Sequence, residues 1–353
     1  MNIDKENAKP QIGWFCSYVP EELIIAAGLE PVRLQGQVET IKEADSYLFS
    51  NFCPYIKHIL DTGLRGKFSN LEGIIFANSC DGMRRLYDLW TQYVETPFSY
   101  MLEIPKNRDG NGIEYLSDQL LDLKGRLEEV FAVNISNDKL DKAISIMNDH
   151  KETIMEIFEK QKEVPSPHKG SKLMALCLDE TTGLKEEGTI KLREFIEQSI
   201  NSSNPEDKLT RILVLGNEGG KLTLFNLIED AGASVVAFDT CYGLKHYSDL
   251  VEKDRDPIKS LARRYLLKPP CYRMPGFDTR TERLKKLCQD YSIDGIIYSY
   301  IKFCDYGQYE APEIERFSKN SQLPLLELEN DYIISDTGRI RTRVEAFVEM
   351  IRD

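Results

Sequence analysis

Two stretches of the sequence alternate buried, strand-like runs with helical patterns, and this alternation is typical of parallel α/β units. In the first stretch we expect a helix at 20–28, a strand at 31–34, a helix at 54–60 and a buried strand ending in a turn at 73–82. In the second we expect a strand running into a glycine-rich turn at 211–220, a helix at 222–230, and strands at 231–238, 294–305 and 323–329. The chain is therefore expected to form two parallel sheets with helices packed on them.

The two stretches resemble each other, which suggests a duplicated architecture. An Ala-Gly pair precedes a strand at Gly28 and again at Gly232. A run of Gly-Ile-Ile followed by an aromatic residue leads to Cys80 in the first stretch and to Cys304 in the second. A different pairing also exists, because NSCDGMRRLYDL and DTCYGLKHYSDL share a Cys-x-Gly core behind a strand.

Helical patterns fill the region between the two stretches. Leu and Ile recur at three- and four-residue spacing over 112–163, and a second helical stretch covers 171–200, with the linker VPSPHKGS between them. A closing amphipathic helix is expected at 342–351. The expected fold class is α/β, with two flavodoxin- or Rossmann-like lobes at 1–110 and 206–353 and a mainly helical connecting region at 111–205. Open parallel sheets bind ligands at the carboxyl ends of their strands, so the cleft between the lobes is the expected site.

Six of the eight cysteines occupy similar sequence contexts. Four follow expected strand ends, one precedes a proline and one follows two prolines; the six are Cys16, Cys53, Cys80, Cys241, Cys271 and Cys304. Soft thiolates favour iron–sulfur clusters, zinc or copper, and the long spacings differ from the close Cys-x-x-Cys pairs of zinc ribbons. A cluster gathered from separate loops fits the spacing, and six unrelated core thiols is the alternative. Cys177 and Cys288 lie inside helical patterns and are expected to be packing residues.

Composition and motifs exclude several functions. The formal net charge of −13 argues against nucleic acid as a partner. No apolar run is long enough to span a bilayer, and the N-terminal segment lacks the features of a signal peptide, so a cytoplasmic location is expected. The four histidines form no metal-binding spacing. The glycine-rich turn at 216–220 lacks the order of a dinucleotide site and the Lys-Ser/Thr of a P-loop, so we do not expect the chain to hydrolyse ATP.

Several motifs together give the chain a resemblance to a known family. They occur in the family's order and span nearly the whole chain: GWFCSYVPEELIIAAGLEPVRL, SNFCPYIKHILDTGLRG, NSCDGMRRLYDLW, KPPCYRM, DGIIYSYIKFCD and RIRTRVEAFVEM. With these motifs the sequence resembles the 2-hydroxyacyl-CoA dehydratase and benzoyl-CoA reductase family, which includes double-cubane cluster proteins. The resemblance implies an oxygen-sensitive iron–sulfur enzyme of anaerobes, with electrons supplied by a separate ATP-hydrolysing iron–sulfur activator protein.

The resemblance leaves the cluster type and the reaction open. Three cysteines suffice for a four-iron, four-sulfur cluster with an open site, as in a dehydratase, and six suffice for a linked double cubane, as in a reductase of small molecules. Because six are well placed, we favour the double-cubane reductase. The alternatives are a dehydratase or aryl-CoA reductase subunit and a non-catalytic electron relay. A homodimer, or a heterodimer with a homologous subunit, is expected.

Carboxylates near the cysteines are candidates for acid–base catalysis. Glu21 and Glu22 follow Cys16 closely and are our candidate catalytic residues. The alternative for both is a structural role, since acidic residues in the first turn of a helix offset the helix dipole.

Overall fold

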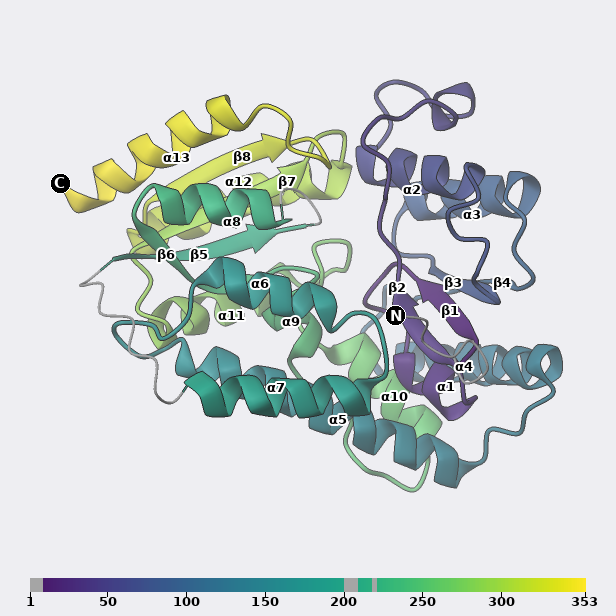
Figure 1. Cartoon of the computed structure of the whole chain (residues 1–353). Coiled ribbons are helices and arrows are strands. Elements are labelled where there is room, and N and C mark those ends of the chain that lie inside the picture. The colour runs from purple at the N-terminus through teal and green to yellow at the C-terminus, as the bar shows by residue number, and fades with distance from the viewer. Residues whose placement is uncertain (1–8, 200–208, 218–220) are drawn as a thin grey trace.

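The computed structural model describes residues 9–199, 209–217 and 221–353, which form two lobes, each built around a four-stranded parallel sheet (Figure 1). The order of strands is β2-β1-β3-β4 in the N-terminal lobe and β6-β5-β7-β8 in the C-terminal lobe. The expected α/β class with two parallel-sheet lobes is confirmed.

The N-terminal lobe holds the first four strands and the helices between them. Its elements are β1 (Gln11–Trp14), α1 (Glu21–Ala26), β2 (Glu30–Arg33), a short 3₁₀ turn (Ala44–Ser46), α2 (Pro54–Leu64), β3 (Gly73–Ala77), α3 (Asp81–Tyr93) and β4 (Ser99–Leu102). Four longer helices follow: α4 (Gly110–Phe131), α5 (Asn137–Lys160), α6 (Gly170–Asp179) and α7 (Lys185–Ser199). The single helical stretch expected at 171–200 is thus two helices, because residues 180–184 form a turn around Gly183, which has a φ of +83°.

The C-terminal lobe repeats the strand and helix alternation. Its elements are β5 (Thr210–Gly216), α8 (Lys221–Asp230), β6 (Ala233–Asp239), α9 (Leu244–Tyr247), α10 (Pro257–Leu267), α11 (Phe277–Asp290), β7 (Gly295–Ile301), α12 (Asp305–Ser321), β8 (Leu325–Asn330) and α13 (Thr337–Arg352). Every residue of β5, β6 and β7 is buried, as expected for parallel strands with helices on both faces.

The identical strand orders support the duplicated architecture inferred from sequence. β2 and β6 occupy equivalent edge positions, and each follows a glycine in the left-handed region, Gly28 at φ +81° and Gly232 at φ +83°. β3 and β7 are likewise equivalent, so Cys80 and Cys304 follow corresponding strands. Glycine is needed at these two turns because a side chain strains a left-handed backbone.

The helices between and after the lobes tie them together. α5 packs against α1 in the N-terminal lobe and against α7 and α9, and it runs beneath both lobes in Figure 1. α10 packs against α4, and residues from Val251 to Met274 join the hydrophobic core of the N-terminal lobe. The second half of the chain therefore completes the core of the first lobe.

Two features predicted from the sequence fall outside the described residues in whole or part. Positions 218–220 of the glycine-rich turn and the expected domain boundary at 205/206 are among them. The division into three regions stays a prediction. Within the described residues, no helix is long and apolar enough to cross a membrane.

Candidate functional site

Four of the six cysteines lie just past the carboxyl ends of strands. Cys16 follows β1, Cys80 follows β3, Cys241 follows β6 and Cys304 follows β7. The expected position at strand ends is therefore confirmed for all four. This is the edge at which open parallel sheets place their ligands.

Three of the cysteines are also the N-cap residues of helices: Cys53 of α2, Cys80 of α3 and Cys304 of α12. The backbone N–H of Met83 donates to Cys80 Sγ at 3.4 Å. The partial positive charge at a helix N-terminus stabilises a nearby anion, including a thiolate. These positions favour ionised thiols and any anionic group that the thiols hold.

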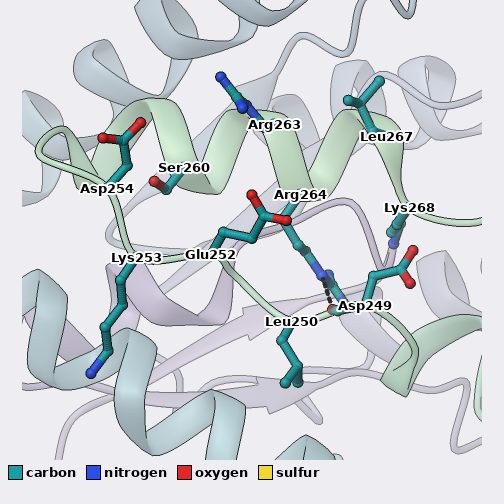
Figure 2. A pocket seen from close by; sticks show the side chains of 10 residues that line it. All are labelled: Asp249, Leu250, Glu252, Lys253, Asp254, Ser260, Arg263, Arg264, Leu267 and Lys268. Carbon is teal, nitrogen blue, oxygen red and sulfur yellow. Dashed lines mark hydrogen bonds between the residues drawn. The ribbon is translucent and has the colours of Figure 1, made fainter.

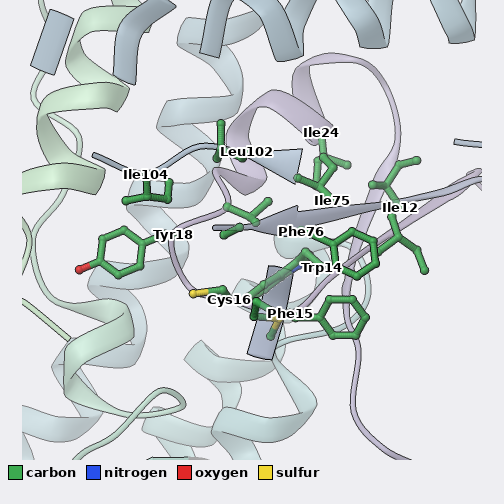
Figure 3. Packing of buried hydrophobic residues seen from close by; sticks show 14 of the residues in the cluster. Ile12, Trp14, Phe15, Cys16, Tyr18, Ile24, Ile75, Phe76, Leu102 and Ile104 are labelled. Atoms are coloured by element: carbon green, nitrogen blue, oxygen red, sulfur yellow. The ribbon is translucent and has the colours of Figure 1, made fainter. Parts of the chain in front are cut away.

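The other three cysteines lie in turns that contact the opposite lobe. The N–H of Cys271 donates to the hydroxyl of Tyr18 at 3.4 Å, and the Arg33 guanidinium donates to the carbonyl of Cys241 at 2.6 Å. Figure 3 shows Cys16 and Tyr18 at the edge of the first core, with the Tyr18 hydroxyl pointing away from Ile75 and Phe76. The two lobes thus bring their cysteine-bearing turns together.

The electrostatic neighbours of the thiols fall into two groups, and each group draws from both lobes. Burial raises the pKa of Cys53 to about 12, and the next contribution comes from Cys304, with Cys80 adding to it. Burial likewise raises the pKa of Tyr18 well above its usual value, with Cys271 and then Cys16 contributing.

Cys241 is linked electrostatically to the second of these groups. Burial disfavours the charge of Lys245, yet Asp239 and Glu310 raise the pKa of this lysine, with smaller contributions from Cys271 and Cys241. Grouping by space therefore differs from the grouping by order along the chain. Cys53, Cys80 and Cys304 form one group; Cys16, Cys241 and Cys271 form the other.

Buried cations surround the thiols. Lys268 is 1% exposed, and its ammonium donates to the Ser17 carbonyl and, at 3.1 Å, to the Ser17 hydroxyl. Burial and the nearby Arg264 lower the pKa of Lys268 to about 7, whereas Cys16 acts in the opposite direction. Burial also lowers the pKa of Lys106, with Cys271 opposing it.

The chemistry of these residues fits an iron–sulfur group. Thiolates are the ligands that hold such clusters, and cations and helix N-termini would offset the negative charge of thiolates and sulfide. No set of three His, Cys, Asp or Glu side chains within the described parts of the chain is placed to hold a single metal ion. The fit therefore rests on the donor set and its charge environment.

Glu21 and Glu22 lie in the first turn of α1 and are at most 1% exposed. Glu22 is 3.0 Å from the Lys151 ammonium and accepts a hydrogen bond from Tyr265 at 2.7 Å. Glu21 lies 3.3 Å from Lys185 and 3.6 Å from His246. These ion pairs join α1 to helices from the rest of the chain.

The ion pairs also set the protonation state of both carboxylates. Burial alone would raise their pKa values, but Lys185 outweighs it for Glu21 and Lys151 outweighs it for Glu22, so both pKa values are lowered. Both groups are therefore carboxylates held in ion pairs. Their candidate role in acid–base catalysis stays a prediction.

A cavity of about 260 Å³ lies beside α10 and ends at Lys268 (Figure 2). Its other charged lining residues are Asp249, Glu252, Lys253, Asp254, Arg263 and Arg264. Arg264 Nε donates to the Asp249 carbonyl at 2.9 Å, which fixes one wall. Because Cys16 and Cys271 act on the pKa of Lys268, this cavity leads toward the second thiol group.

Sequence reasoning missed the cations. Lys268 and Arg273 flank Cys271 in the motif KPPCYRM, and their charges beside a cysteine were the available signal. Lys106 and Lys245 carried no such signal, because they are far from any cysteine or follow one at a distance typical of ordinary helix residues.

Comparison with known proteins agrees with this geometry. The family model described as 2-hydroxyglutaryl-CoA dehydratase, D-component, matches residues 16–351. The beta subunit of (R)-phenyllactyl-CoA dehydratase from Clostridium sporogenes is 24% identical, over 98% of this chain and 93% of that protein. The beta subunit of lactoyl-CoA dehydratase from Anaerotignum propionicum is 26% identical, with the same two coverages. One of the benzoyl-CoA reductase subunits from Thauera aromatica is 20% identical, over 99% of this chain and 92% of that protein. The chain belongs to the 2-hydroxyglutaryl-CoA dehydratase D-component family, an enzyme family whose members include subunits of dehydratases and of a reductase.

Proposed function

We propose that this protein binds an iron–sulfur cluster through the six cysteines and reduces small molecules with low-potential electrons from a separate ATP-hydrolysing activator. The observation that carries the proposal is the gathering of thiols from both lobes among buried cations. Such an arrangement stabilises a large negative charge, which six unrelated core thiols would not require. When bound, an iron–sulfur group supplies one-electron reduction at a potential that the protein sets by burial and hydrogen bonding.

The spatial grouping supports a cluster of the double-cubane type. Cys53, Cys80 and Cys304 would hold one four-iron unit, and Cys16, Cys241 and Cys271 the other. The first three would be stabilised by helix N-termini. The other three lie in turns held by Tyr18 and Arg33 across the lobes.

Serine substitution of single cysteines tests the ligand assignment. Cys271→Ser is expected to lose about half of the iron bound per chain after anaerobic reconstitution, because one of two thiolate groups is incomplete. Cys288→Ser is the matched control: it changes a free cysteine in α11 and is expected to retain all iron. Equal iron content in both variants would remove Cys271 from the ligand set.

A subunit of a 2-hydroxyacyl-CoA dehydratase is the second candidate function. The names of two relatives as dehydratase beta subunits favour it. In this case the cluster would have an open site, and a homologous second subunit would complete the enzyme. Dehydration of a panel of 2-hydroxyacyl-CoA thioesters, with activator, ATP and such a subunit, tests it. Turnover of any thioester would favour the dehydratase over the small-molecule reductase.

A further inference from the structure

Arg273 lies two residues after Cys271, in the segment between α10 and α11. Its guanidinium stands 5.2 Å from the centre of the Tyr272 ring, and its Nε is buried without a hydrogen-bond partner. Within the described ranges, the guanidinium has neither an ion pair with a carboxylate nor a hydrogen bond to another protein group. The backbone carbonyl of Arg273 accepts from the Lys106 ammonium at 2.7 Å, which anchors this segment to the N-terminal lobe.

The charged neighbours of Arg273 are thiols from both groups. Burial disfavours its charge, yet Tyr272 and the thiols of Cys80, Cys271 and Cys304 raise the pKa of Arg273 further above its usual value. Arg273 in turn lowers the pKa of Cys53. The guanidinium therefore stays charged, and it lies where the two groups of thiols meet.

Two other arginines nearby show what is missing at Arg273. Arg283 donates to Asp239 at 2.9 Å, and Arg280 Nε lies 3.0 Å from Glu310. Each thus has a carboxylate to balance its charge. A buried cation without a balancing anion is strongly destabilising, so the balancing charge for Arg273 must come from the thiolates or from the group they hold.

We propose that Arg273 is a positioning residue that donates a hydrogen bond from its guanidinium to the iron–sulfur group and balances charge between the two groups of thiols. This inference rests on the proposed function, because it requires that the thiols hold such a group. A cation next to the cluster favours the reduced form, which carries one more negative charge. Arg273 would therefore raise the reduction potential.

Redox titration of the reconstituted protein, followed by electron paramagnetic resonance, tests the proposal. In Arg273→Met the equilibrium constant for reduction is expected to fall at least tenfold, which is about 59 mV for one electron. Arg273→Lys keeps the charge but loses the planar fork of donors, so an intermediate shift is expected. Arg316→Met is the control: it removes an exposed arginine of α12 that pairs with Glu313, and it should leave the potential unchanged.

The cluster-free protein provides a second readout. Without the cluster the charge of Arg273 is unbalanced, so cluster-free Arg273→Met is expected to melt at a higher temperature than the cluster-free wild type. If Arg273 were only a packing residue, the variant would melt at a lower temperature. A potential within twofold of the wild-type equilibrium constant, or a lower melting temperature in a variant that cannot be loaded, would overturn the proposal. Failure of the wild type and Arg316→Met to bind iron would instead overturn the proposed function.

Discussion

Substitution of Lys151 by methionine probes the buried ion pairs that hold the two halves of the chain together. Lys151 lies in α5 and Glu22 in α1, both are fully buried, and their charged atoms are 3.0 Å apart. The only other protein group bonded to the Glu22 side chain within the described residues is the Tyr265 hydroxyl, at 2.7 Å. Lys151→Met therefore leaves a buried carboxylate with one neutral donor.

The expected loss of unfolding free energy is about 3–5 kcal/mol, the range for breaking a buried pair by removing one partner. Burial and the neighbouring Arg264 lower the pKa of Lys151 to about 8, so keeping this lysine charged is itself unfavourable. For that reason the double variant Glu22→Gln/Lys151→Met should recover most of the loss. A buried pair and its neutral replacement of similar volume are often nearly equal in stability.

Urea unfolding of the cluster-free protein at neutral pH, followed by circular dichroism, measures both effects. Lys142→Met is the control, because it removes an exposed lysine from the same helix. A loss of less than about 1 kcal/mol for Lys151→Met, the value of an exposed pair, would refute the reasoning. So would a double variant that is less stable than the single one.

Two further predictions concern pH and packing. Burial lowers the pKa of His246 to about 3, so between about 6.5 and 3 the unfolded chain binds a proton that the folded chain does not, and unfolding free energy falls as pH falls through this window. His246→Gln should flatten the decline measured by urea unfolding at several pH values; an unchanged slope would contradict this. A Cβ at Gly63 would lie 2.6 Å from the fully buried ring of Trp90, so Gly63→Ala should cost about 1–3 kcal/mol. Gly125→Ala, which has open space in α4, should instead be stabilising by about 0.5–1 kcal/mol, and melting curves of the two variants that move in the same direction would disprove the packing argument.

The sequence predicted the local elements of the fold well, because each of them is encoded over a few residues. The helix at α1 begins after Pro20 and is followed by Gly28 at φ +81°, as the proline and glycine indicated. The strand ends that carry Cys16 and Cys304 were also predictable, because continuous apolar runs mark buried parallel strands. The equal strand orders of the two sheets followed from the repeated Ala-Gly and Gly-Ile-Ile motifs.

The contacts between distant segments could not be predicted in this way. Glu22 reads as an acidic residue in the first turn of a helix, but its partner Lys151 is 129 positions away. The same holds for the thiols: Cys53 and Cys304 are neighbours in space although order along the chain placed them in different groups. Such pairings depend on how the lobes pack, and no local pattern records that.

Iron and acid-labile sulfide, measured per chain after anaerobic purification or reconstitution, test the central claim most directly. Six thiolate ligands in two groups predict about eight irons per chain. About four irons, retained when Cys241 and Cys271 are both replaced by serine, would contradict the double-cubane assignment. A protein that binds no iron under these conditions would contradict the claim that the gathered thiols form a cluster site.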